Sequence, residues 1–159
     1  MRNSANATLI SEIARDVLAE LAPQEMPIFP AASRAYFANR DAALKQFRSK
    51  DYVLGFGMDP LAVFLTPAVL YILSEVFEFL TDIAKKTIEA GLEKEIPEIV
   101  KAMFKKFHSS EPSIGSVLTK EQIALIHGNI LLAAKKLRLP ADKARSLANT
   151  VTAQLVLPK

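Results

Sequence analysis

The chain has 159 residues, of which 50% are hydrophobic and 23% are charged, and its formal net charge at pH 7 is +3. This apolar fraction is too high and this net charge too small for a disordered chain, and the length suits one domain with a substantial core. Because the chain contains no cysteine, the composition excludes disulfide bonds, cysteine-ligated zinc or iron–sulfur sites, and a thiol nucleophile.

The first 25 residues have the pattern of an amphipathic helix rather than that of a secretory signal peptide. A signal peptide contains an uninterrupted apolar run, whereas charged residues interrupt this segment at Glu12, Arg15, Asp16 and Glu20. We therefore expect a cytoplasmic protein, with membrane association left open by a later segment.

The predicted elements of the first third are two helices and a linker. The apolar positions from Ile10 to Leu21 follow the helical period and predict an N-terminal helix within residues 1–22. Residues 23–30 contain three prolines, which remove backbone donors and predict an extended linker. Residues 31–49 are rich in alanine and predict a second helix.

The segment Tyr52–Ser74 is nearly uncharged and allows three interpretations. Its 23 residues carry one charged side chain, Asp59, so it resembles a membrane span by hydropathy alone. Two glycines and two prolines interrupt it, and its longest uncharged piece, residues 60–74, is shorter than the roughly 20 residues that a spanning helix needs. A buried core segment is the leading interpretation, a membrane-inserting segment the second, and an exposed partner site the third.

A long helix is predicted from Thr66 and Pro67 to a cap at Gly91, because Thr caps helices, Pro suits the first helical position and Gly suits the position after the last. Its apolar stripe is wide, which predicts burial on more than one side. A helix over residues 93–108 follows. A loop then precedes Thr119, which forms a predicted capping box with Gln122.

The last part of the chain, residues 119–159, is predicted to form a helical hairpin with its turn at residues 138–140. No segment shows the alternation of a β-strand. The sequence as a whole therefore predicts an all-α, single-domain bundle of about six helices that ends in a helical hairpin. Residues 31–118 supply its central helices.

The sequence contains no convincing catalytic, cofactor or metal constellation. Neither His108 nor His127 follows a glutamate at the spacing used in helical di-metal sites, and no serine lies in a nucleophile elbow. We expect His127 to pack between helices, and we expect a protein that is not an enzyme and has no cofactor and no metal.

The charge is distributed unevenly. Residues 1–100 carry 10 basic and 14 acidic side chains, a net charge of −4, whereas residues 101–159 carry 10 basic and 3 acidic ones, a net charge of +7. Such asymmetry indicates an electrostatic contact surface, unless the basic residues are dispersed over solvated faces. The candidate contact residues are Lys101, Lys105, Lys106, Lys135, Lys136, Arg138, Lys143 and Arg145.

An apolar strip of Tyr71, Ile72 and Phe79 is predicted to be exposed beside acidic residues, and exposed apolar strips usually mark interfaces. The leading functional hypothesis is a non-enzymatic helical interaction module that binds a protein partner or a second copy. One alternative is docking to an anionic membrane through residues 52–80. The other is DNA binding through a C-terminal helix-turn-helix that presents Lys143, Arg145 and Thr150 among others.

Overall fold

The computed structural model describes residues 2–49, 65–87, 91, 93–107 and 118–156. Within these ranges the chain is helical, and the expected all-α single domain is confirmed, with seven α-helices. The α-helices are α1 Arg2–Leu21, α2 Phe29–Ala38, α3 Arg40–Ser49, α4 Thr66–Thr87, α5 Ile96–Ala102, α6 Lys120–Lys136 and α7 Ala141–Ala153. The described residues also form three short 3-10 helices: η1 Pro23–Ile28, η3 Glu93–Glu95 and η4 Lys105–Phe107.

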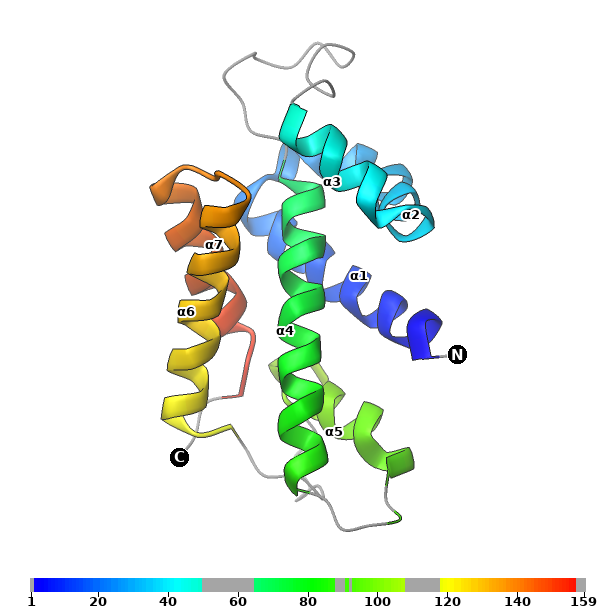
Figure 1. Cartoon of the computed structure of the whole chain (residues 1–159), viewed down its shortest axis with the longest axis vertical. Coiled ribbons are helices and arrows are strands. Elements are labelled where there is room, and N and C mark those ends of the chain that lie inside the picture. Colours follow the sequence, from blue (N-terminus) through cyan, green and yellow to red (C-terminus); the bar gives the residue numbers. More distant parts are fainter. Residues whose placement is uncertain (1, 50–64, 88–90, 92, 108–117, 157–159) are drawn as a thin grey trace.

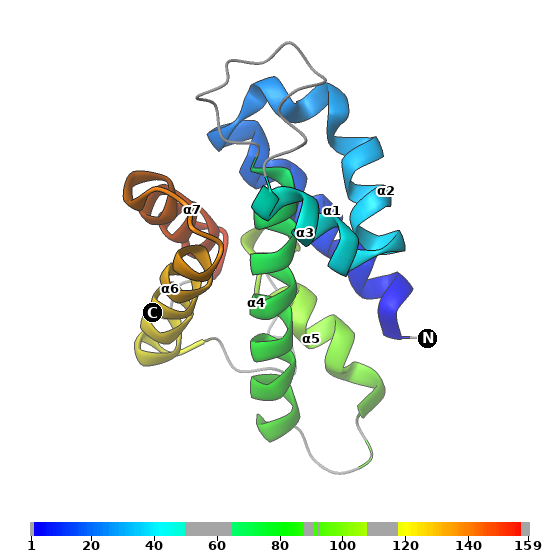
Figure 2. The same ribbon diagram turned by 45° about the horizontal axis from the view of Figure 1, so that its top comes forward.

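Helix α4 is the centre of the molecule. It lies along the long axis, with the α6–α7 hairpin on one side and α1, α2 and α3 on the other, while α5 packs beside its second half (Figures 1 and 2). Helix α6 runs antiparallel to α4 (Figure 1). The apolar residues of α4 are buried on several sides, as the width of its stripe predicts. Residues 65–74 of the Tyr52–Ser74 segment are therefore largely core, and residues 50–64 lie outside the described part.

The prediction of an extended linker at residues 23–30 is wrong, because these residues form η1 and the start of α2, which begins at Phe29. Prolines lie in the first turns of both helices, where a missing N–H has no helical partner to lose. Within η1 the side chain of Glu25 is fully buried, at 0% exposure.

Glu25 caps the N-terminus of α4, although it precedes Leu65 by 40 residues in the sequence. Its Oε2 accepts the Leu65 amide at 2.8 Å, and its Oε1 accepts both the Thr66 amide at 2.8 Å and the Thr66 hydroxyl at 2.6 Å. A carboxylate at this end of a helix satisfies free N–H groups and also complements the helix dipole. The cap expected from Thr66 is thus supplied by Glu25, and the Thr66 hydroxyl is a donor to it.

The stability of the chain is expected to depend on the titration of Glu25. Burial raises the pKa of its carboxyl above the ordinary 4.5, although hydrogen bonds from Leu65 and Thr66 and the charge of Lys143 act in the opposite direction. Folding is therefore coupled to protonation of Glu25. The contribution of this protonation to the free energy of unfolding is complete below pH 4.5, the ordinary pKa. It is lost as the pH rises through the pKa of Glu25 in the folded state. Urea titrations should show the wild type losing free energy of unfolding relative to Glu25→Gln as the pH rises. A difference that stays constant or grows with pH would contradict this expectation.

The single helix expected at residues 31–49 is divided at Asn39 into α2 and α3. Asn39 has non-helical dihedral angles, φ −152° and ψ 88°. Its side-chain Oδ1 accepts the Ala42 amide at 3.0 Å, which is the bond of a helix N-cap. The break follows from this residue, because asparagine competes with helical hydrogen bonding in a helix interior and favours caps.

The helix expected over residues 93–108 is also shorter than predicted, with η3, α5 and η4 in its place. After α5 the backbone pairs with the end of the chain. The Lys105 amide donates to the Gln154 carbonyl at 2.7 Å, and the Val156 amide donates to the Met103 carbonyl at 2.8 Å. These bonds flank the β-bridge between Phe104 and Leu155, and this pairing lies directly after the last residue of α5.

The predicted capping box is confirmed, with Thr119 and Gln122 bonded reciprocally at 2.9 and 3.0 Å. At its other end α6 closes with Arg138 in the left-handed region, at φ 61°. The Leu139 amide donates to the Ala134 carbonyl at 3.0 Å, which is the long bond of a Schellman motif. This motif turns the chain back into α7 and gives the expected hairpin.

Candidate functional site

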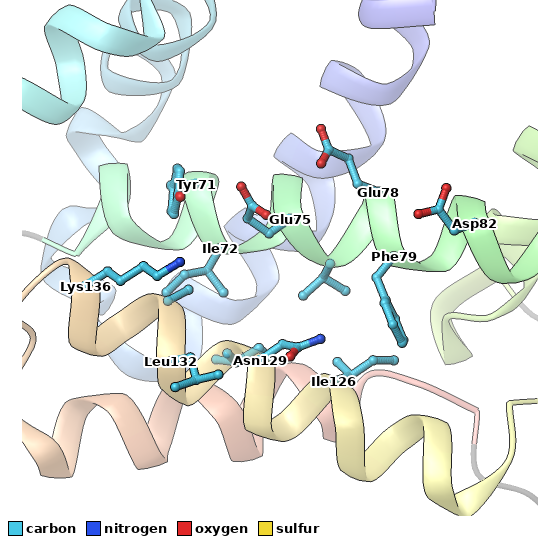
Figure 3. Close-up of a pocket in the computed structure, with 13 residues that line it drawn as sticks. Tyr71, Ile72, Glu75, Glu78, Phe79, Asp82, Ile126, Asn129, Leu132 and Lys136 are labelled. Atoms are coloured by element: carbon cyan, nitrogen blue, oxygen red, sulfur yellow. The ribbon is translucent and has the colours of Figure 1, made fainter.

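A groove of about 310 Å³ lies between α4 and α6. Its floor is apolar, because the antiparallel helices bring Ile72 and Val76 of α4 against Ile126 and Ile130 of α6, and all four side chains are buried. Figure 3 shows this row of apolar side chains between the two helices. The apolar surface that the groove offers to another molecule belongs to Tyr71, Phe79 and Leu132, which are partly buried or exposed.

The edge of the groove on α4 is acidic, whereas the edge on α6 carries both apolar and basic side chains. Glu75, Glu78 and Asp82 line the α4 edge and are exposed, and Figure 3 shows the carboxylates of Glu78 and Asp82 on the side of α4 away from α6. On α6, Leu132 is 61% exposed. Lys136 stands at the end of the groove near Tyr71 (Figure 3). An apolar floor beside a row of carboxylates suits a ligand that is both apolar and basic.

The residues of the predicted apolar strip come together in this groove, but the strip is not exposed as expected. Ile72 is 0% exposed, because one residue further along the helix turns its side chain toward α6. Tyr71 and Phe79 are partly buried, and Phe79 reaches from α4 toward Ile126 (Figure 3). Phe79 therefore forms one wall of the groove.

One neighbour of the groove, Arg40, contacts both Tyr71 and Glu75. The Arg40 guanidinium carbon lies 5.4 Å from the centre of the Tyr71 ring, and its Nη2 lies 3.7 Å from the Glu75 carboxylate. Both ends of this ion pair are about half exposed, at 44% and 47%, so it contributes little to stability. Arg40 thus joins α3 to the α4 edge of the groove without closing it.

The predicted basic residues divide into two groups, one in α5 and η4 and the other around the α6–α7 turn. In the first, Lys106 Nζ lies 2.9 Å from Asp16 Oδ2, and the ammonium groups of Lys101 and Lys106 lie 5.2 and 5.7 Å from the Phe107 ring centre. These two lysines therefore make contacts within the chain, and Lys105 beside them is exposed. The second group lies around the α6–α7 turn, and all its members are exposed: Lys135, Lys136, Arg138, Lys143 and Arg145.

The face that a helix-turn-helix would present on α7 is partly occupied. Thr150 is buried at 8% exposure, so its expected presentation to DNA is wrong; it lies on the side of α7 that packs on the core. Asn149 Oδ1 lies 2.8 Å from His127 Nε2 of α6. His127 thus packs between helices as expected, and it joins the two arms of the hairpin.

The described ranges contain no group of three metal-ligating side chains, and none of their helices is long and apolar enough to cross a membrane. A second hollow of about 520 Å³ lies among α1, α2 and α4. Beside it the buried Tyr36 hydroxyl lacks a hydrogen-bond partner among the described residues. Ser74 Oγ is nearby, but its hydroxyl donates to the Leu70 carbonyl at 2.8 Å.

Sequence reasoning missed two exposed leucines of α6. Leu125 is 56% exposed and Leu132 is 61% exposed. The two are seven residues apart, which places both on one face of the helix. The sequence contained a signal for this second face. Leu125 and Leu132 are not in the four-residue series of the buried Ile126, Ile130 and Ala134.

Comparisons with protein-family models, with curated protein sequences and with solved structures find no match to this chain.

Proposed function

We propose that this protein is a non-enzymatic helical interaction module, and that the groove between α4 and α6 binds an amphipathic helix of a partner protein. The observation that carries the proposal is the groove itself, with its buried apolar floor and the partly exposed Phe79 at its wall. Amphipathic helices bind grooves of this kind through apolar side chains on successive turns.

The length of the groove suits a short helix. Its lining residues on α4 run from Tyr71 to Asp82, which corresponds to about 17 Å along the helix axis, or three turns. A partner helix of three turns presents apolar side chains at positions i, i+3 or i+4, and i+7. Such a helix would place these side chains over Tyr71, Phe79 and Leu132, the apolar lining residues that keep exposed surface.

The charge of the groove favours a basic partner. Glu75, Glu78 and Asp82 form an acidic edge along α4, and complementary charge contributes to orientation and to the rate of association. We therefore expect the partner helix to carry lysine or arginine on the flank that lies over α4.

A pair of synthetic helical peptides tests the proposal. Both carry leucine at positions i, i+4 and i+7; one has lysine and the other glutamate on one flank. Fluorescence anisotropy should show tighter binding of the lysine peptide and a loss of about tenfold with Phe79→Ala, since a central aromatic contact is worth more than about 1 kcal/mol. Phe37→Ala is the matched control, because Phe37 is 38% exposed on α2 and does not line this groove.

Charge reversal separates specific docking from nonspecific attraction. A Glu78→Lys and Asp82→Lys double variant should invert the preference and bind the glutamate peptide more tightly. Equal binding of both peptides by every variant, or no binding by the wild type, would refute the groove as a docking site. Circular dichroism of each variant shows whether it has kept its helices.

The two alternatives receive less support from the described residues. Membrane docking through residues 65–80 would require α4 to leave a core in which Leu70, Leu73 and Leu80 are fully buried; residues 52–64 are outside the described ranges. DNA binding would use an α7 face on which Asn149 already contacts His127. Binding to anionic vesicles, or to DNA at low salt with a steep salt dependence, would favour these alternatives. A cytoplasmic location remains part of the proposal, and fractionation of cells that express the chain tests it.

A further inference from the structure

The outward face of α6 carries a stripe that is not covered by any other part of the chain that the structure describes. Its members alternate in spacing by four and three residues, and this heptad pattern places them on one side of a helix. They lie opposite the buried Ile126, Ile130 and Ala134. The stripe consists of Glu121, Leu125, Gly128, Leu132 and Lys135, and we call it the outer stripe of α6.

The glycine at the centre of the outer stripe is not required by the packing of the described residues. A glycine in a helix interior costs about 1 kcal/mol relative to alanine. A Cβ added at Gly128 would meet nothing within 4 Å, so no neighbouring group of the described chain requires its absence. Small residues at such positions allow another helix to approach closely. Gly128 therefore points to a helix from outside the chain.

The outer stripe is complementary to itself in the antiparallel direction. Glu121 and Lys135 each lie seven residues from Gly128, and Leu125 and Leu132 lie three and four residues from it. A twofold axis at Gly128 would bring Glu121 of each copy beside Lys135 of the other. It would also bring each Leu125 beside the other copy's Leu132. A twofold interface needs this kind of self-complementary patch.

We propose that the outer stripe of α6 binds a second copy of this chain in an antiparallel helix pair centred on Gly128. Figure 2 shows α6 at the periphery of the molecule, with α4 and α7 on its inner sides. One helix pair falls at the small end of the range of specific interfaces, below about 1,200 Å². We therefore expect a weak dimer, which dissociates at concentrations on the order of micromolar.

Analytical ultracentrifugation of the full chain over a range of concentrations measures the association. The wild type should pass from monomer to dimer as the concentration rises. Leu125→Glu should be a monomer throughout, since a carboxylate would then lie in the apolar part of the contact. Gly128→Leu should also be a monomer, although a Cβ at this position meets no described atom within 4 Å and leucine favours helix.

A mixing experiment tests the antiparallel register. Glu121→Lys and Lys135→Glu should each weaken the dimer, because each puts like charges opposite one another. Mixed in equal amounts, the two variants should form a heterodimer in which both ion pairs are restored. The double variant should recover the wild-type association. No parallel arrangement predicts this recovery, because it would place position 121 of one copy beside position 121 of the other.

Several outcomes would overturn the proposal. These are a wild type that stays monomeric at all concentrations, a dimer that persists in Leu125→Glu and Gly128→Leu, and single variants that fail to associate when mixed. A monomeric wild type that binds anionic vesicles through Leu125 would assign the outer stripe to a lipid surface and would also overturn it. Leu132 belongs to both the outer stripe and the groove lining. The two outcomes are therefore separated with Phe79, which lies outside the outer stripe, and with Leu125, which lies outside the groove lining.

Discussion

Replacing Glu25 with alanine is expected to lower the free energy of unfolding by about 3–5 kcal/mol. The substitution removes the acceptor of three buried hydrogen bonds, from the Leu65 amide, the Thr66 amide and the Thr66 hydroxyl. A buried donor left without an acceptor costs about 1–3 kcal/mol. Part of the total cost of the three lost bonds is offset, because the alanine variant no longer has to bury a carboxylate. Urea denaturation followed by circular dichroism measures the change.

Two variants distinguish the capping role of Glu25 from a general effect of losing a glutamate. Glu20→Ala removes an exposed glutamate of α1 and should change the stability by less than about 0.5 kcal/mol. Glu25→Gln keeps one carbonyl oxygen for Thr66 but turns an amide donor toward the Leu65 amide, so its effect should be intermediate. If Glu25→Ala were as stable as Glu20→Ala, the cap would contribute nothing to the fold.

The position of Glu25 explains why sequence reasoning missed it. The residue lies among prolines, where a charged side chain is typical of a solvated loop, and its partners are 40 and 41 residues further along the chain. No local pattern reports a contact at that separation. By contrast, the capping box of α6 joins residues three apart, and the local sequence was sufficient to predict it.

The other differences between the predicted and observed helices also have either a local or a distant cause. The break at Asn39 had a local signal, because asparagine followed by a helical segment is typical of an N-cap. The early end of α5 had none, since it depends on pairing with residues 154–156. The periodic helices α1, α4, α6 and α7 were predictable from their apolar spacing.

The candidate site divides in the same way. The apolar stripe of α4 identified Tyr71, Ile72 and Phe79, but it could not say that α6 would lie against Ile72 and bury it. Which helices become neighbours is decided by tertiary packing. The basic residues were correctly identified as abundant near the end of the chain, yet the fold separates them into two groups. A count of charges in sequence does not determine whether they share a surface.

Replacing Phe104 with alanine is expected to lower the free energy of unfolding by about 3–5 kcal/mol, the range for a buried phenylalanine. Phe104 is 0% exposed, and its ring stacks on that of Phe77 with centroids 5.1 Å apart and planes at 19°. Its backbone forms the bridge to Leu155, so the same residue joins the end of α5 both to α4 and to the end of the chain. Urea denaturation measures the loss of stability.

Hydrogen exchange distinguishes this joining role from simple loss of apolar volume. In Phe104→Ala the amides of Lys105 and Val156, which bond across the bridge, should exchange faster than amides in the middle of α6, because the bridge opens before the molecule unfolds. Phe37→Ala, at an exposed phenylalanine that touches Tyr36 edge-on, should cost about 1 kcal/mol or less and leave both amides protected. If the exchange rates of all amides rose equally in Phe104→Ala, the ring would stabilise the whole fold and would not specifically stabilise the pairing with the C-terminal segment.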